Sequence, residues 1–184
     1  MNNQYIRWNN EDIPRYVLGT AQLGFDYGIA NKEGMPNLQK ADRIVKAAWK
    51  SGARGFDTAQ GYGRSEYVLG QALNNSGFLE EAIIITKLNP DKEPNNPTWV
   101  IPSVFESCNI LGVTHIWGLK LHRFEWIEYM DKEFGDIIRR LKTERLIKHF
   151  GVSVYTHNEA LTAINHPDID IIQVPCNFWS PHLL

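Results

Sequence analysis

Four side chains that could move a proton follow consecutive apolar runs of the sequence. Asp57 ends the run "GFD", and Tyr62 lies between two glycines shortly after it. Lys87 ends "IIITK", and His122 ends "IWGLKLH". An ammonium group lowers the pKa of a nearby phenol, so Lys87 could make Tyr62 a usable acid, with Asp57 as the partner of the lysine. With His122 hydrogen-bonded to a substrate oxygen, these residue types predict a proton donor for a carbonyl group that accepts a hydride.

Each of these residues also has an ordinary structural explanation. A carboxylate at a strand end often caps the next loop, and a lysine there is usually a solvated end. A lone histidine is usually a satisfied structural residue, and a tyrosine beside glycine commonly packs a turn. Two aromatic residues, Phe25 and Tyr27, follow an earlier apolar run and either line a substrate pocket or pack their own loop. The joint occurrence of four consistent roles favours catalysis over these single explanations.

The elements that must position these residues alternate between strand and helix. Apolar runs predict strands at 16–24, 55–59, 82–87, 116–122, 149–154 and 171–177. Helical spacing predicts helices at 38–52, at 65–76 with Ser65 as N-cap and Gly77 as its stop, within 98–111, at 126–146 and at 157–164. On the first of these helices, Leu38, Ala41, Val45 and Ala48 are expected on the buried face. This alternation predicts an α/β fold with a parallel sheet and helices outside it.

Two architectures fit that alternation, an open doubly wound sheet and a (β/α)8 barrel of the TIM type. Polar side chains lie at or near the ends of five successive predicted strands: Asp57, Lys87, His122, Ser153 and Gln173. A barrel gathers all the carboxyl ends of its strands at one rim. An open sheet gathers only those near its switch point. The pattern therefore favours the barrel, present as about six βα units.

Several segments resemble the aldo/keto reductase family. "GFDTAQGYGRSEYVLGQAL" is close to its most specific motif, and "LGTAQLG", "IIITKL", "HFGVSV" and "IIQVPCN" resemble its other strands. The resemblance implies a (β/α)8 barrel that reduces an aldehyde or ketone with NADPH, with NADH as the alternative cofactor. It implies Tyr62 as the general acid, Lys87 and Asp57 as the pair that tunes its pKa, and His122 as the residue that orients the carbonyl.

The same resemblance implies where the cofactor and the substrate bind. It places Gly19 and Thr20 in cofactor binding, and it makes Ser153 and Gln173 the residues that hold the nicotinamide carboxamide. Val154 stands where the family usually has asparagine, which removes one expected contact with that carboxamide. The segment "GTAQLGFDYGIAN" is most similar to family members from sugar-modification settings. The implied substrate is a small carbonyl compound, and a sugar-derived one is the more specific expectation.

Length sets a further expectation, because 184 residues provide six units whereas a complete barrel takes about 250 residues or more. The sequence thus predicts one incomplete barrel domain over 1–184, C-terminally truncated, without strands seven and eight. Open barrel edges expose unpaired backbone groups, and three explanations stay open: a truncated gene product, a homo-oligomer that covers the edges, and a second chain that supplies the missing part. Two other functions stay open: a non-catalytic remnant or interaction module, and a Schiff-base aldolase with Lys87 as nucleophile.

Composition excludes several other classes of protein. A formal net charge of -2 gives no electrostatic case for nucleic acid or an anionic membrane. The sequence has no apolar run long enough to span a membrane and begins without a secretory signal pattern, so a cytoplasmic location is expected. The two cysteines, Cys108 and Cys176, form no disulfide framework or metal spacing and are expected to be small buried residues. No metal is expected.

Overall fold

The computed structural model describes residues 4–29 and 31–177 of the chain. It divides into two compact units, each described below by itself. The first contains the residues up to Thr86 together with Glu106–Thr114. The second contains Lys87–Phe105 and the residues from His115 onward.

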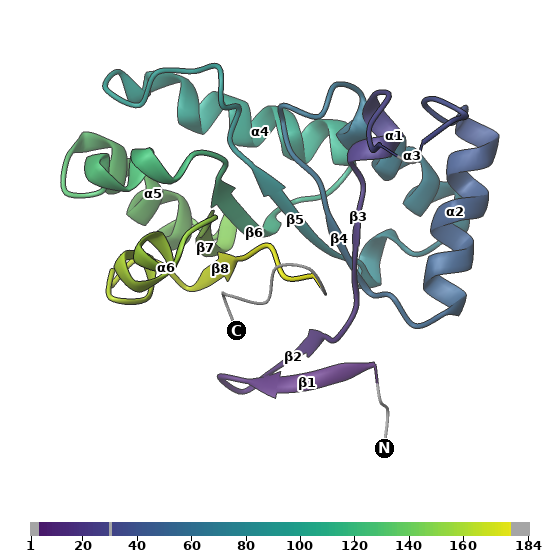
Figure 1. Cartoon of the computed structure of the whole chain (residues 1–184), viewed down its shortest axis with the longest axis horizontal. Coiled ribbons are helices and arrows are strands. Elements are labelled where there is room, and N and C mark those ends of the chain that lie inside the picture. The colour runs from purple at the N-terminus through teal and green to yellow at the C-terminus, as the bar shows by residue number, and fades with distance from the viewer. Residues whose placement is uncertain (1–3, 30, 178–184) are drawn as a thin grey trace. The chain divides into compact units, whose positions relative to one another are not determined.

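The first unit is built on three parallel strands. They are β3 (Val17–Gly19), β4 (Gly55–Asp57) and β5 (Ile83–Lys87), of which the last residue counts with the second unit. They pair in this order, with Gly19 opposite Asp57 and Asp57 opposite Ile85. The helices are α1 (Ala21–Gly24), α2 (Leu38–Lys50), α3 (Ser65–Ser76) and the 3₁₀ turn η1 (Leu79–Glu81). Figure 1 shows α2 and α3 side by side next to β3 and β4.

Helix α2 forms where the sequence predicts it, but its buried face is shifted. Asn37 caps its start by accepting a hydrogen bond from the backbone N–H of Lys40 at 2.9 Å. Its buried residues are Ala41, Val45 and Trp49, whereas Leu38 is 43% exposed. The Trp49 ring stacks on Phe78, with 4.4 Å between ring centroids, so a large aromatic contact decides which face is buried.

Helix α3 ends as predicted but begins differently. Gly77 follows it at φ +70°, a left-handed conformation that glycine adopts without a steric penalty. The predicted N-cap role of Ser65 is wrong, because Ser65 is the first helical residue and Arg64 occupies the cap position without a side-chain bond. The Ser65 hydroxyl instead hydrogen-bonds other segments of the unit, as described below.

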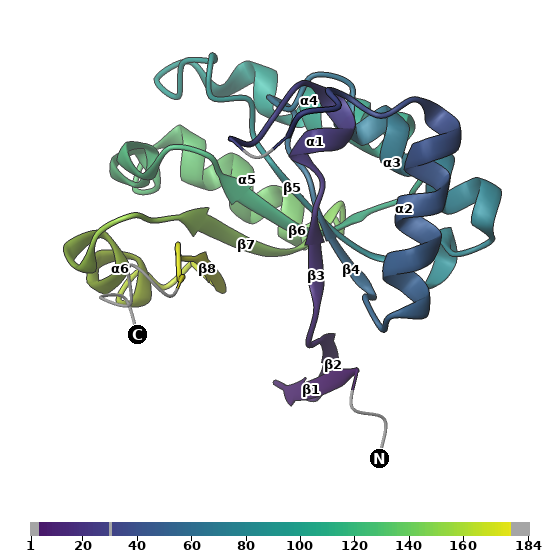
Figure 2. The same ribbon diagram turned by 45° about the vertical axis from the view of Figure 1, so that its right-hand side comes forward.

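A hairpin that the sequence analysis did not predict precedes β3. Its strands β1 (Tyr5–Trp8) and β2 (Glu11–Pro14) pair antiparallel. The two linking residues, Asn9 and Asn10, have φ values of 44° and 64°. Two left-handed residues match the twist of a two-residue hairpin turn, so the "NN" pair was the available signal. Figure 2 shows the hairpin at the amino end of β3, away from α1.

The second unit also has three parallel strands in sequence order. They are β6 (Ile116–Leu121), β7 (Ile147–Ser153) and β8 (Ile171–Gln173). The other elements are the 3₁₀ turns η2 (Pro97–Trp99) and η3 (Phe124–Tyr129), and the helices α5 (Glu133–Thr143) and α6 (His157–Ile164). Helix α4 (Val100–Leu111) is divided between the two units.

The prediction of one continuous helix over 126–146 is wrong. The segment is η3 followed by α5, and Lys132 between them is extended, with φ −123° and ψ −171°. The chain approaches itself closely at Gly135, where an added Cβ would lie 1.7 Å from the Met130 carbonyl oxygen. The chain doubles back on itself there, which buries Met130 and Phe134 together with Trp126.

The arrangement of strands confirms the α/β prediction. Apart from the β1–β2 hairpin, every strand within each unit pairs in parallel with its neighbour in sequence, and helical segments connect these parallel strands. The order of the parallel strands does not reverse within either unit. A barrel has the same property, because each of its strands lies beside the previous one in sequence. Among the residues described, none of the helices has both the length and the apolar composition needed to cross a membrane.

Candidate active site

Asp57 lies at the carboxyl end of β4 and is buried. Its backbone carbonyl oxygen accepts two hydrogen bonds from Thr20, one from the backbone N–H at 2.9 Å and one from Oγ1 at 3.0 Å. Thr20 directly follows β3, so these bonds extend the pairing of β3 with β4 by one residue. The position of Asp57 is thereby fixed by its backbone.

Tyr62 stands on the tight turn between β4 and α3. Its backbone N–H donates to the Ala59 carbonyl and its carbonyl accepts from the N–H of Ser65, both at 3.0 Å. The turn packs directly against α1, because a Cβ on Gly24 would lie 1.7 Å from the Tyr62 carbonyl oxygen. Gly63 has φ +55°, and a Cβ there would lie 2.7 Å from the Gly24 carbonyl oxygen. Glycine at both positions is therefore required by the close approach of these backbones.

The two predicted substrate-pocket residues lie in the same unit as Tyr62. The ring centroid of Phe25 is 6.0 Å from that of Tyr62 and 5.5 Å from that of Tyr27. Both residues are partly exposed, Phe25 at 36% and Tyr27 at 53%. Tyr62 thus has an aromatic surface beside it that is open to a small molecule.

The surroundings of Tyr62 within its own unit raise the pKa of the phenol to about 12, through burial first and then through Asp57 and Tyr27. The phenol is therefore fully protonated at neutral pH. Burial, Asp57 and Tyr27 thus raise the pKa of Tyr62, whereas Lys87 is predicted to lower it. Lys87 belongs to the second unit. The grouping of Asp57 and Tyr62 with Lys87 and His122 stays a prediction.

Above pH 10 the protein is expected to lose stability that a Tyr62→Phe variant keeps. The folded-state pKa of about 12 exceeds the ordinary value of 10.0, so the folded state binds the phenolic proton more tightly. That contribution to stability is complete below pH 10 and is lost as the pH rises toward 12. Screening at this partly exposed ring reduces the effect to about 1 kcal/mol. Urea unfolding of both proteins at about pH 9 and about pH 11 measures it, and an identical pH dependence would contradict the expectation.

A cluster of buried hydroxyl groups holds the strand ends near Asp57, and the sequence analysis missed it. Ser65 Oγ donates to the Thr20 carbonyl at 2.8 Å and lies 2.9 Å from Thr20 Oγ1. Thr58 Oγ1 donates to Ser65 Oγ at 3.0 Å. All three residues are at most 1% exposed. Thr20, which the resemblance assigns to cofactor binding, uses its hydroxyl for these internal bonds.

The second unit holds the other two predicted catalytic residues. Lys87 ends β5 and is 2% exposed. The next residue, Leu88, donates its backbone N–H to the Lys120 carbonyl at 3.0 Å, which fixes the chain after Lys87 alongside β6. His122 directly follows β6 and is partly buried.

The two predicted carboxamide-binding residues lie together in this unit. Ser153 Oγ lies 3.4 Å from Gln173 Oε1, and the same oxygen accepts a hydrogen bond from Lys120 Nζ at 2.5 Å. Lys120 is 3% exposed and was missed by the sequence analysis, although a lysine within the apolar run "IWGLKL" was a visible signal. Because the amide oxygen of Gln173 faces Lys120, this contact sets the orientation of the amide.

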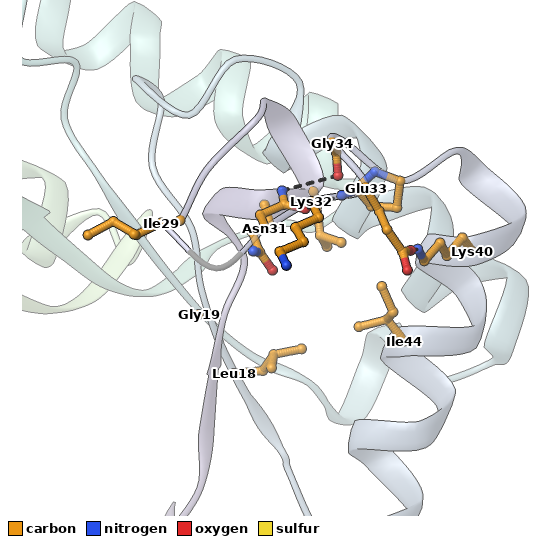
Figure 3. Close-up of a pocket in the computed structure, with 13 residues that line it drawn as sticks. Leu18, Gly19, Ile29, Asn31, Lys32, Glu33, Gly34, Lys40 and Ile44 are labelled. Atoms are coloured by element: carbon orange, nitrogen blue, oxygen red, sulfur yellow. Dashed lines mark hydrogen bonds and ion pairs between the residues drawn. The ribbon is translucent and has the colours of Figure 1, made fainter.

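A cavity of about 680 Å³ opens beside the carboxyl end of β3. Figure 3 shows it between β3, the loop that carries Asn31 and Gly34, and helix α2. Gly19 lines it, and a Cβ built there would meet no atom within 4 Å. An ion pair between Lys40 and Glu33 lies on its α2 side. The backbone of Gly19 is thus open to a ligand.

The cysteines differ from each other. Cys108 is buried as predicted, and burial, with Glu66 nearby, raises the pKa of its thiol to about 11. The expectation that Cys176 is buried is wrong, because it lies exposed after β8.

Within residues 4–29 and 31–177, His, Cys, Asp and Glu side chains form no group of three that could hold a metal ion.

Two relatives share part of this sequence. D-arabinose 1-dehydrogenase of Saccharomyces cerevisiae is 31% identical over 146 residues, which are 76% of this chain and 42% of that protein. Pyridoxal 4-dehydrogenase of Microbacterium luteolum is 36% identical over 197 aligned residues, covering 83% of this chain and 55% of that protein. The chain therefore spans about half the length of these relatives.

Solved structures share the fold. A Pseudomonas aeruginosa protein described as an aldo-keto reductase superposes with a TM-score of 0.77 at 26% identity, over 94% of this chain and 67% of its own. The Bombyx mori aldo-keto reductase in complex with NADP superposes with a TM-score of 0.69 at 23% identity, over 95% of this chain and 57% of its own. These matches confirm the barrel type that the strand-end pattern predicted.

The sequence relationship extends as far along the chain as the structural one. The model of the Aldo/keto reductase family matches residues 15–183, a range that begins just before β3 and includes every parallel strand described above. This chain belongs to the aldo/keto reductase family.

Proposed function

We propose that the protein is an oxidoreductase that reduces an aldehyde or ketone to an alcohol with NADPH. The observation that carries the proposal is the setting of Tyr62, a protonated phenol beside Phe25 that follows a strand ending in the buried Asp57. Family membership and two relatives named as dehydrogenases support the same class of reaction. The four proposed catalytic residues are Asp57, Tyr62, Lys87 and His122.

The proposed roles follow from the charge that develops on the substrate. Bound NADPH supplies a hydride to the carbonyl carbon. Tyr62 donates its phenolic proton to the carbonyl oxygen as that oxygen becomes anionic, and it regains a proton from solvent. A phenol with a pKa of about 12 is a weak acid, so the proposal requires the ammonium of Lys87 to stabilise the phenolate. Asp57 keeps Lys87 charged, and His122 hydrogen-bonds the carbonyl oxygen.

The proposed cofactor-binding residues are Gly19 and Thr20 in the first unit and Ser153 and Gln173 in the second. Ser153 and Gln173 hold the nicotinamide carboxamide, and Gly19 and Thr20 let the cofactor approach the end of β3. The open space at Gly19 supports this, as does the NADP in the Bombyx mori relative. The contacts of Gln173 with Lys120 and Ser153 support it too, because they hold the Gln173 side chain in place beside Ser153. NADH is the alternative cofactor.

The proposed substrate is a small hydroxylated carbonyl compound such as a sugar aldehyde. One relative is named for D-arabinose and another for pyridoxal, an aldehyde. The partly exposed Phe25 and Tyr27, whose rings meet edge to face, offer aromatic surface for the carbon face of such a ring. Because the same groups serve both directions, a sugar alcohol with NADP+ is the substrate for the reverse assay.

Titration of NADPH fluorescence tests the proposal first. The protein is expected to bind NADPH with a Kd on the order of micromolar. A Gly19→Ala variant is expected to bind about tenfold more weakly with unchanged thermal stability, because the added Cβ meets no protein atom within 4 Å and occupies space open to a ligand. Size measurement on the same sample tests whether the protein forms a homo-oligomer. Folded protein that binds neither NADPH nor NADH would favour the non-catalytic alternative.

A further inference from the structure

A buried carboxyl group that the proposed mechanism does not use lies in the first turn of α3. Glu66 is 7% exposed, and hydroxyl groups hold both of its oxygens. Thr86 Oγ1 donates to Oε1 at 2.6 Å, and Ser107 Oγ donates to Oε2 at 3.2 Å. Gln60 Nε2 donates in turn to Ser107 Oγ at 3.1 Å. Thr86 and Ser107 are themselves at most 1% exposed.

Burying the Glu66 carboxyl group costs folding free energy compared with burying an apolar side chain at the same place. Burial raises the pKa of Glu66, the bonds from Thr86 and Ser107 oppose that rise, and Glu106 adds to it. An unbranched apolar side chain of similar length would fill the same space without removing a carboxyl group from water. A buried polar group held by several bonds does what an apolar side chain does not: it fixes the relative placement of the segments that it joins.

The segments joined at Glu66 are those next to two proposed catalytic residues. Thr86 immediately precedes Lys87 in β5, and Gln60 is two positions before Tyr62 on the turn after β4. Ser107, which connects Gln60 to Glu66, belongs to α4. We propose that Glu66 is a positioning residue, whose carboxyl group holds the end of β5 and the start of the Tyr62 turn in place, and so sets the directions of Lys87 and Tyr62. The inference rests on the proposed function in taking those two residues as catalytic.

Geometry explains why such positioning matters for a proton donor. Catalytic groups must be held close to their productive arrangement, and a shift of about 1 Å costs about 100-fold in rate. The backbone at the end of β5 determines where the Lys87 side chain points. The turn from Gln60 to Gly63 determines where the phenol points. The proposed effect of Glu66 on the two side chains passes through Thr86 on one side and through Ser107 and Gln60 on the other.

The test compares three variants of the intact protein. Glu66→Met removes both hydrogen bonds at similar length. Glu66→Gln keeps an acceptor for Thr86 and a donor for Ser107. Glu80→Gln is the matched control, because Glu80 is an exposed acid of the same unit. Amide hydrogen exchange without cofactor reports on the segments 60–64 and 86–88, and steady-state kinetics report kcat and KM.

The expected result is a local and rescuable effect. Glu66→Met speeds exchange in both segments about tenfold, while Glu66→Gln and Glu80→Gln leave it within about threefold of wild type. Glu66→Met also lowers kcat about 30-fold, with the KM for the carbonyl compound within about threefold. If Glu66→Met does not fold, Thr86→Val and Ser107→Ala replace it, with faster exchange expected at 86–88 and at 60–64 respectively.

Two results would overturn the inference. Exchange in both segments that stays at the wild-type rate shows that Glu66 does not hold them. Faster exchange spread evenly over the first unit shows general destabilisation instead of positioning. The proposed function is tested separately. If wild-type protein reduces no carbonyl compound, that function is ruled out, and the exchange measurement still decides whether Glu66 holds the two segments.

Discussion

Replacement of Tyr62 by phenylalanine is expected to lower kcat for carbonyl reduction about 1,000-fold, within the range that a positioned acid contributes. The variant lacks only the phenolic oxygen, so the ring contact with Phe25 and the packing of the turn against Gly24 are retained. NADPH binding and thermal stability at neutral pH are therefore expected to stay near wild type. Single-turnover measurement of NADPH oxidation in the presence of an excess of aldehyde gives the rate of the chemical step.

Tyr67 provides the control for this substitution. It lies on α3 in the same unit, is 40% exposed, and has its ring under the Arg64 guanidinium at 5.4 Å. Tyr67→Phe should leave the rate within about twofold of wild type. Turnover that survives in Tyr62→Phe would falsify the assignment of the acid. Capture of the carbonyl compound on Lys87 by borohydride would move the chemistry to the Schiff-base alternative.

A Gly24→Ala substitution is expected to destabilise the protein by about 3 kcal/mol or more, as severe overpacking does. The added methyl carbon would lie 1.7 Å from the Tyr62 carbonyl oxygen and 2.6 Å from the Ser65 nitrogen, both backbone atoms. Backbone atoms move only if the turn separates from α1. The same separation carries Tyr62 away from Phe25, so activity is expected to fall with stability.

Urea unfolding at neutral pH measures the loss of stability, and Gly19→Ala is the matched control. Gly19 lies five positions earlier, at the end of β3, and a Cβ there meets no atom within 4 Å. The control is expected to unfold within about 0.5 kcal/mol of wild type. A Gly24→Ala protein that is destabilised by less than about 1 kcal/mol would show that α1 and the Tyr62 turn separate easily.

Much of the fold could be predicted because local patterns carried it. Helices α2, α3 and α6 lie within their predicted ranges, Gly77 ends α3 as predicted, and the parallel strands fall within or beside the predicted apolar runs. Asp57 and Lys87 are expected at strand ends because each follows an apolar run, and they end β4 and β5 in the structure. Local patterns misled where the helical spacing of Trp126, Met130 and Phe134 continues across the extended residue Lys132, which separates η3 from α5.

The sequence by itself determined the α/β class, the order of the elements and the residue types available at the strand ends, because periodicity and turn residues act over a few positions of the chain. Tertiary structure alone decided which partners these residues have. Ser65 was read as a helix cap but bonds Thr20, 45 positions away, and Lys120 bonds Gln173, 53 positions away. Such contacts depend on how strands and helices pack in space, and no local pattern specifies them. The polar network around Glu66 is decided in the same way, because Thr86 and Ser107 reach it only in the folded unit.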